Sequence, residues 1–257
     1  MQRSPSTSRN PASAAPWGWA VAGALLGVVV AVVLFAPARW LSAVVNQASA
    51  GQVRLVELRG TVWNGSARLL LTGGSGSRDS AALPGHVDWR LRPGWLTLNF
   101  QLTADCCTPA PLQARLSPGW SASVLQLADG TSQWPAALLA GLGTPWNTVK
   151  AEGSLRLMTK DLALTWNDGR MVVAGRAELT ALAMSSRLST LKPMGSYRIT
   201  LNGGDSTALE VTTLEGSLQL SGSGQWVGAR LRFQGLASAA PEHEAALANL
   251  LNIIGAP

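Results

Sequence analysis

Two hydrophobic patterns divide this chain. The first is an uncharged run of nineteen residues from Trp17 to Phe35, WGWAVAGALLGVVVAVVLF. As a helix it is about 28 Å long, close to the thickness of a bilayer's hydrocarbon core. From Val53 onward, apolar and polar residues alternate with a period of two instead, as in antiparallel strands with one buried face. We therefore predict a mostly β protein: one N-terminal transmembrane helix, then an antiparallel β-sheet domain with a short C-terminal helix.

The charges around the apolar run predict its orientation. Arg3 and Arg9 precede it, and the first acidic residue of the chain is Glu57. The positive-inside rule then places the N-terminus in the cytoplasm and the large domain on the other side. The predicted segments are a cytoplasmic tail (1–16), a transmembrane helix (17–37), a membrane-proximal segment (38–52) and the β domain (53–257).

A cleaved signal peptide is the alternative for the apolar run. Ala36-Pro37-Ala38 has the A-x-A form of a cleavage site. The apolar core of a signal peptide is usually about 7–15 residues long, however, and this run is longer. We favour an uncleaved anchor, and both interpretations place the bulk of the chain outside the cytoplasm.

Three short helices are predicted outside the anchor. Residues 39–48 have apolar positions at helical spacing, and this helix would lie on the membrane surface or extend the anchor. Residues 135–142 would form the second helix. Pro241 begins the third, whose apolar stripe should pack on the sheet or on a partner. The stripe consists of Leu247, Leu250, Leu251 and Ile254.

Segments that combine Trp with Gly recur along the β region. Trp63-Asn64-Gly65 is echoed by Trp226-Val227-Gly228, and Pro93-Gly94-Trp95 by Pro118-Gly119-Trp120. Trp and Gly suit hairpins in general, because Gly accepts positive φ and Trp covers a large area of sheet. The alternative is a duplicated β unit, with halves at 53–145 and 146–257.

Composition and motifs argue against several functions. Residues 39–257 carry 18 Lys and Arg against 14 Asp and Glu, without a basic helix, which disfavours nucleic-acid binding. The chain has two histidines and lacks the sequence motifs of serine hydrolases, nucleotide-binding loops and zinc sites. Glu242-His243-Glu244 is too compact to hold one ion from a helix, because neighbouring residues point in different directions. We predict no catalytic residue, no metal site and no cofactor.

The two cysteines, Cys106 and Cys107, are adjacent. An ordinary disulfide has Cα atoms about 5.5 Å apart, whereas neighbours across a trans peptide are about 3.8 Å apart. This disfavours a bond between them and leaves two free thiols or a bridge to another chain. We expect two loop cysteines without a catalytic role.

The order of several motifs resembles that of a known family. Gly60-Thr61-Val62-Trp63-Asn64-Gly65 follows the anchor, and the closing part contains Pro193-Met194-Gly195-Ser196-Tyr197 and the run from Thr213 to Trp226, TLEGSLQLSGSGQW. With the short tail and single span, this order is similar to that of type II secretion system protein N, an inner-membrane component of a Gram-negative secretion pathway. The resemblance covers most of the chain.

The resemblance implies a place in a machine rather than a reaction. The chain would be a non-enzymatic inner-membrane component with a periplasmic β domain, supporting export of folded proteins across the outer membrane. Its partners would be other inner-membrane or periplasmic secretion components, with no small-molecule substrate and no nucleic acid. Candidate contact residues are the exposed tryptophans and the hairpins with Trp63, Gly65, Trp226 and Gly228.

A second function of another class also fits the pattern. A long antiparallel sheet with one apolar face can form a groove for acyl chains, and periplasmic lipid-transfer proteins are often anchored by one N-terminal helix. The eleven tryptophans and many leucines could line such a groove. The alternative is therefore an anchored periplasmic lipid-binding or lipid-transfer protein.

Overall fold

A computed structural model describes residues 17–74, 76–167, 170–204, 206–227 and 230–254. The chain divides into two compact units, residues 1–36 and 37–257. In the first unit, α1 (Trp17–Leu34) is an 18-residue helix long and apolar enough to cross a membrane. It ends three residues before the predicted bound at 37, because proline has no N–H to donate and disfavours a helical residue before it.

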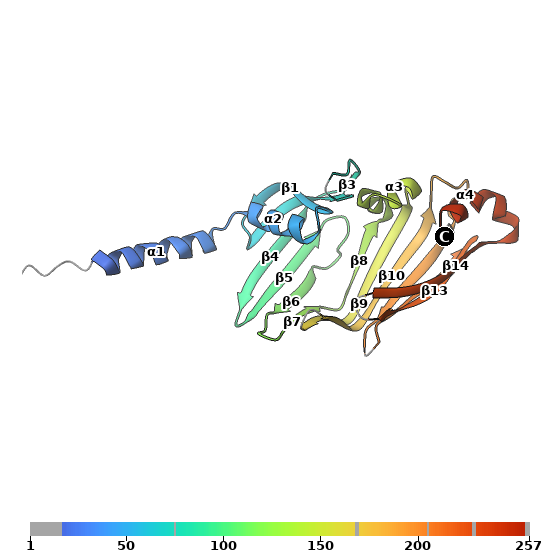
Figure 1. The fold of residues 1–257 in the computed structure, drawn as a ribbon. Helices are drawn as coiled ribbons and strands as arrows, with labels where there is room; N and C mark the ends of the chain where they lie inside the picture. The colour runs from blue at the N-terminus through green and yellow to red at the C-terminus, as the bar shows by residue number, and fades with distance from the viewer. Residues whose placement is uncertain (1–16, 75, 168–169, 205, 228–229, 255–257) are drawn as a thin grey trace, which may run out of the picture. The chain divides into compact units, whose positions relative to one another are not determined.

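The second unit is built on one antiparallel sheet of 14 strands (Figure 1). The strand order is β1-β2-β4-β5-β6-β7-β9-β10-β11-β12-β13-β14, with β3 paired to β2 and β8 paired to β9. The strands are β1 (Val53–Gly60), β2 (Asn64–Thr72), β3 (Ser80–Ala82), β4 (Val87–Gly94), β5 (Thr97–Ala104), β6 (Leu112–Ser117), β7 (Ala122–Leu127), β8 (Gly130–Pro135), β9 (Glu152–Asn167), β10 (Arg170–Ser185), β11 (Gly195–Asn202), β12 (Ala208–Gly216), β13 (Leu218–Val227) and β14 (Arg230–Ala239). The predicted fold class is confirmed.

The register of the strands explains why the alternation was informative. Leu102 of β5 lies opposite Trp89 on β4, whereas the preceding residue, Gln101, lies opposite Arg90. Successive side chains of a strand point to opposite faces, so this pairing collects apolar residues on one face and polar residues on the other.

Helical segments cover parts of the apolar face. They are α2 (Ala38–Ala48), η1 (Ala136–Leu142), α3 (Trp146–Val149), η2 (Pro241–His243) and α4 (Glu244–Ile254). Ala38 of α2 is buried in one core cluster, Leu138 of η1 in a second, and Leu247 and Leu250 of α4 in a third. The predicted helices at 135–142 and after Pro241 are present, and the last packs on the sheet.

The segment after the anchor does not continue the anchor helix, and a position on the membrane surface stays a prediction. Pro37 has an extended backbone (φ −70°, ψ 147°), so α2 is a separate helix rather than an extension of the anchor. Its Ala38 packs with Ala67 and Trp89 of the sheet, and the Ser42 hydroxyl donates to the carbonyl of Leu55 at 3.2 Å. The predicted helical spacing is present, but only part of the apolar side packs on the sheet: Leu41 contacts this core cluster, whereas Trp40 is 48% exposed and Val44 is 62% exposed.

The sheet has two dissimilar ends. Because neighbouring strands run in opposite directions, the β1–β2, β4–β5, β6–β7, β9–β10, β11–β12 and β13–β14 connections all fall at one end, which we call the turn edge. The segment with η1 and α3, between β8 and β9, and the segment after β14 with α4 fall at the other end, the helix edge (Figure 1).

The sheet is continuous across the boundary of the two predicted halves. Leu125 of β7 pairs with Leu164 of β9, and Ser132 of β8 pairs with Leu157 of β9. Hydrogen-bonded strands thus join residues before 145 to residues after 146. An origin by duplication stays a prediction.

Candidate functional site

The Trp63 hairpin is a packed corner of the sheet. Trp63 lies in the β1–β2 connection, half-buried, and its carbonyl accepts a hydrogen bond from the Leu91 N–H at 2.7 Å. The buried indole of Trp89 donates from Nε1 to the carbonyls of Thr61, at 3.2 Å, and Val62, at 3.0 Å. These bonds hold the connection against β4.

Gly65 has a structural reason to be glycine. A Cβ at this position would lie 2.5 Å from the Arg59 carbonyl oxygen and 2.6 Å from Cζ2 of Trp89. Both separations are shorter than van der Waals contact, and the first involves backbone that moves only with the strand. Gly65 therefore lets the Trp89 ring lie against β2. A direct contact of Trp63 or Gly65 with a partner stays a prediction.

The second predicted hairpin lies far along the strand order from the first. Trp226 is half-buried near the end of β13, opposite Leu231 of β14, and its N–H donates to the carbonyl of Thr207 at 3.1 Å. Gly228 lies outside the described residues. The structure places Trp63 and Trp226 at the same edge but does not bring them together, because β4 through β12 lie between their hairpins.

The most exposed tryptophans of the sheet belong to the other Trp-Gly pair. Trp95, in the β4–β5 connection, is 92% exposed and Trp120, in the β6–β7 connection, is fully exposed. The repeated Pro-Gly-Trp sequence marked both turns. The exposure of Trp95 and Trp120 is known only from the structure, because a Pro-Gly-Trp sequence does not show whether other segments pack over the turn.

The strand β14 forms an exposed margin of the sheet. It is last in the strand order and pairs along its length with β13 only, among the strands that the structure describes. Leu236 is 69% exposed and Phe233 is 44% exposed. The Phe233 ring lies over Gly222 and Gly224 of β13, where a Cβ would approach it to 2.4 Å and 3.0 Å. β14 is therefore a ten-residue strand that has one side without a paired strand and carries exposed apolar side chains.

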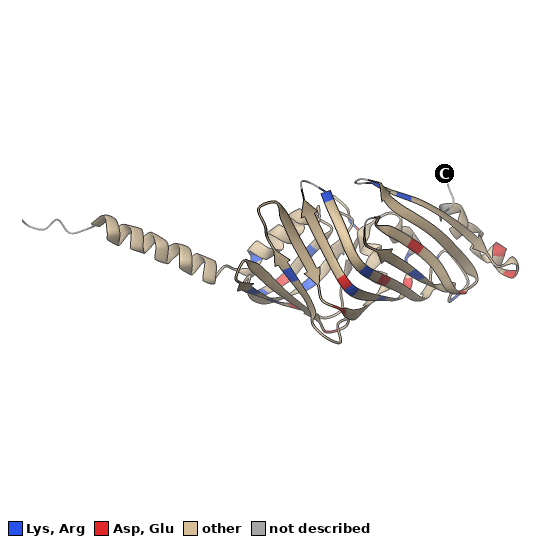
Figure 2. Cartoon of the chain, turned by 90° about the horizontal axis from the view of Figure 1, so that it is seen from below, with Lys and Arg blue, Asp and Glu red and all other residues tan. Residues whose placement is uncertain are grey.

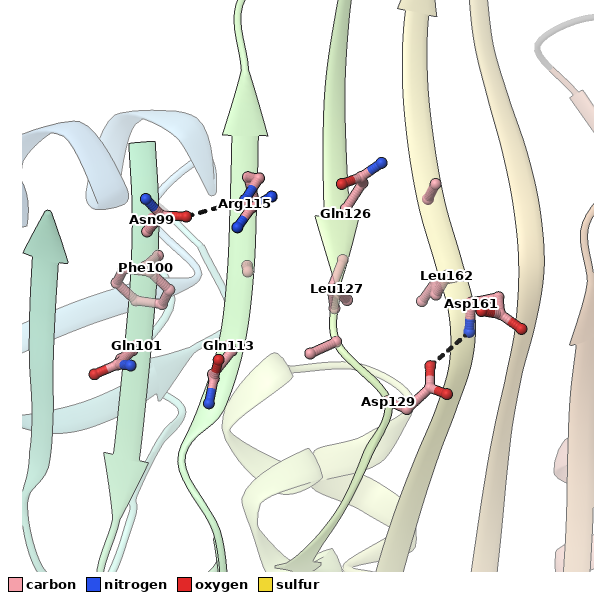
Figure 3. A pocket seen from close by; sticks show the side chains of 13 residues that line it. Asn99, Phe100, Gln101, Gln113, Arg115, Gln126, Leu127, Asp129, Asp161 and Leu162 are labelled. Carbon is pink, nitrogen blue, oxygen red and sulfur yellow. Dashed lines mark hydrogen bonds between the residues drawn. The ribbon is translucent and has the colours of Figure 1, made fainter. Parts of the chain in front are cut away.

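A polar hollow of about 430 Å³ lies over β5, β6, β7 and β9 (Figure 3). Arg115 donates from Nε to the Asn99 amide oxygen at 3.1 Å, and Asp129 accepts from the Asp161 N–H at 2.7 Å. The rest of its lining combines three amides, Gln101, Gln113 and Gln126, with apolar side chains that include Phe100, Leu127 and Leu162. Such a lining can hydrogen-bond a polar ligand. In the described part of the chain no three His, Cys, Asp or Glu residues are grouped to hold a metal ion.

Charged side chains of the strands form ion pairs, and one tyrosine is buried. Glu178 pairs with Arg176 at 3.2 Å and Arg198 at 3.1 Å on the strands, and Figure 2 shows charged residues spread along them. Burial raises the pKa of Tyr197 to about 12, and its hydroxyl has no hydrogen-bond partner among the described residues. Tyr197 belongs to the core beneath α4.

The adjacent cysteines are joined to each other. Cys106 and Cys107 form a vicinal disulfide in the loop after β5, and Cys107 is buried beside Leu83, Val87 and Leu138. The spacing of ordinary disulfides disfavoured this bond, and the sequence had left the redox state of the two cysteines open; the structure has the vicinal bond. The position in a loop was right.

Comparison with known proteins places the chain in a family. Residues 51–257 match the model of a family described as type II secretion system (T2SS), protein N. The chain belongs to this family. The match covers the whole β region, including the Trp63 corner, the hollow and β14, so the resemblance noted in the sequence is confirmed. Searches of curated proteins and of solved structures found no match.

Proposed function

We propose that this protein is a non-enzymatic inner-membrane component of a Gram-negative type II secretion system. Its N-terminus is cytoplasmic, α1 spans the inner membrane, and the β domain works in the periplasm. It supports the export of folded proteins across the outer membrane by binding other components of the apparatus. Membership of the protein N family supports the pathway, and the apolar helix α1 supports the anchor.

The observation that carries a binding role is the open side of β14. An edge strand exposes N–H and C=O groups in the spacing that another strand needs, and soluble proteins usually protect such edges with charges, proline or a covering segment. β14 has arginines at 230 and 232, but its remaining residues, from Phe233 to Ala239, carry no charge and no proline. Such a strand can recruit an extended segment of a partner by strand addition, with main-chain hydrogen bonds supplying affinity.

Crosslinking in the native host tests this interface. A photoreactive phenylalanine analogue at Leu236, on β14, should capture another secretion component. The matched control places it at Val172, which is 50% exposed but lies on β10, an interior strand. Capture from Leu236 and not from Val172 supports strand addition, whereas equal capture, or none from Leu236, contradicts it.

A substitution on β14 tests whether the proposed interface is needed for secretion. Lysine on an edge strand opposes the docking of a further strand, so Leu236→Lys should reduce secretion while Val172→Lys leaves it unchanged. Both side chains are exposed, so neither change should unfold the domain.

One observation favours the alternative of lipid binding. Leu157, Leu179, Ile199 and Val211 face one another across β9 to β12 on the apolar side of the sheet. All four are only half-buried, so the described helices do not fully cover this strip. An acyl chain could lie along it. Extraction in a mild detergent followed by lipid mass spectrometry tests this: stoichiometric lipid supports the alternative, and lipid-free protein contradicts it.

A further inference from the structure

Tryptophans follow the turn edge from one hairpin to the next. Of the six connections at this edge, five carry a Trp within the connection or one residue before the strand's end, and only β11–β12 does not. They are Trp63, Trp95, Trp120, Trp166 and Trp226. Trp146, in α3, lies at the helix edge. This distribution was not visible in the sequence, because it depends on which connections share an end.

Two of these tryptophans lie on neighbouring hairpins and have solvent-exposed side chains. Trp95 is 92% exposed, its neighbour Leu96 is 74% exposed, and Trp120 is fully exposed. Their hairpins are consecutive, because β5 pairs with β6 and Leu98 lies opposite Leu116. With strands about 4.8 Å apart, the centres of the two hairpins are about 10 Å apart. Together they make a paired apolar tip that nothing in the described unit covers.

The chain enters the folded unit at the same edge. Pro37, the first residue of this unit, forms a β-bridge with Thr61 in the β1–β2 connection. The apolar helix ends at Leu34, and three residues of extended chain span about 11 Å at most. The β1–β2 connection is level with Leu91, whose N–H donates to the Trp63 carbonyl. Trp95 lies four residues further along, so the tip projects about 13 Å beyond the point of entry.

The charge around the tip has one sign. The segments 59–66, 90–99 and 115–124 form the ends of the first three hairpins at this edge, and all their residues are described. They contain four arginines, Arg59, Arg90, Arg92 and Arg115, and no aspartate or glutamate. Exposed indoles flanked by basic side chains are the pattern that membrane–water interfaces favour, because the amphipathic ring sits at the headgroup level and anionic headgroups attract the cations.

We propose that the Trp95 and Trp120 tips insert into the headgroup region of the membrane that α1 spans. The β domain then has a second, peripheral membrane contact besides its covalent tether. This contact limits rotation of the domain about the tether and sets which face of the sheet is presented to other molecules. It is independent of the proposed secretion partner, because it needs only the protein and a bilayer.

Fluorescence quenching by brominated lipid tests the contact on the full-length protein. The protein is reconstituted into vesicles of phosphatidylethanolamine and phosphatidylglycerol, with or without bromine on the upper part of the acyl chains. The emission of Trp95 and Trp120 is obtained by subtracting the spectrum of the double variant Trp95→Phe/Trp120→Phe from that of the wild type. The signal of the tryptophans in and next to α1 is common to both proteins and is removed by the subtraction. The emission of Trp146, which is 41% exposed at the helix edge, is obtained in the same way from Trp146→Phe.

We expect the brominated lipid to remove more than half of the Trp95 and Trp120 emission and less than a tenth of the Trp146 emission. Emission from Trp95 and Trp120 that is unchanged by bromine would overturn the proposal and assign the tip to a protein partner or to solvent. Equal quenching of all three would also overturn it, because the domain would then touch the membrane without using the turn edge. Phenylalanine at these exposed positions leaves the fold intact, which circular dichroism checks.

Discussion

Replacing Gly65 by alanine tests whether this residue shapes the sheet or meets a partner. The new Cβ would lie 2.5 Å from the Arg59 carbonyl oxygen and 2.6 Å from Cζ2 of Trp89. Overpacking of this kind costs about 1–3 kcal/mol. Displacing Trp89 would also weaken its hydrogen bonds to Thr61 and Val62, each worth about 1 kcal/mol. We therefore expect Gly65→Ala to lose about 3 kcal/mol of stability.

The assay is thermal unfolding of the full-length protein in detergent, followed by near-ultraviolet circular dichroism. For a domain of this size, about 3 kcal/mol lowers Tm by about 6–12 °C. Gly130→Ala is the matched control, because its Cβ would meet nothing closer than the Ala128 carbonyl at 3.9 Å. Gly65→Ala should also cost less in a Trp89→Leu background, where the ring is absent.

A small effect would refute this reasoning. If Gly65→Ala unfolds within 1 °C of the wild type, the predicted clash does not exist. If the same variant also blocks secretion, the role of Gly65 is contact with a partner rather than packing against Trp89.

Three further predictions follow from the core and the loops. Leu247 of α4 is fully buried against the sheet, so Leu247→Ala should cost about 2–5 kcal/mol in thermal unfolding; a loss as small as that of exposed Leu236→Ala would show that α4 is not packed on the sheet. The folded pKa of Tyr197, about 12, lies above its usual 10, so its contribution to stability is complete below pH 10 and lost as pH rises toward 12; Tm of the wild type should fall in this window more than that of Tyr197→Phe, and parallel curves would contradict the burial. Alkylation under denaturing, non-reducing conditions should modify neither Cys106 nor Cys107, and full alkylation would contradict the disulfide.

The fold class was accessible from the sequence because period-two alternation depends on each strand alone. Residues such as Gln101 and Leu102 identify a strand with one wet face without knowledge of its neighbours. The surface that receives α2 was not accessible, because Ala38 meets Ala67 and Trp89, which come from other strands. Local periodicity carries no information about such distant contacts.

The candidate contact surfaces were only partly predictable for the same reason. The sequence marked Trp63 and Gly65 as a motif, but only the position of the Trp89 ring shows why glycine is needed there. The Pro-Gly-Trp turns were marked as well, yet their common edge depends on the strand order. The open side of β14 also follows from that order, since its sequence alternates like that of other strands.

The central claim is that this membrane-tethered β domain serves type II secretion through contacts. Deleting the gene in its native host and comparing exported proteins in the periplasm and the culture supernatant tests it most directly. We expect folded exoproteins to accumulate in the periplasm, with export restored by the full-length gene and not by the Leu236→Lys variant. Normal export after deletion would contradict the claim, and an accompanying defect in outer-membrane lipid would favour lipid binding instead.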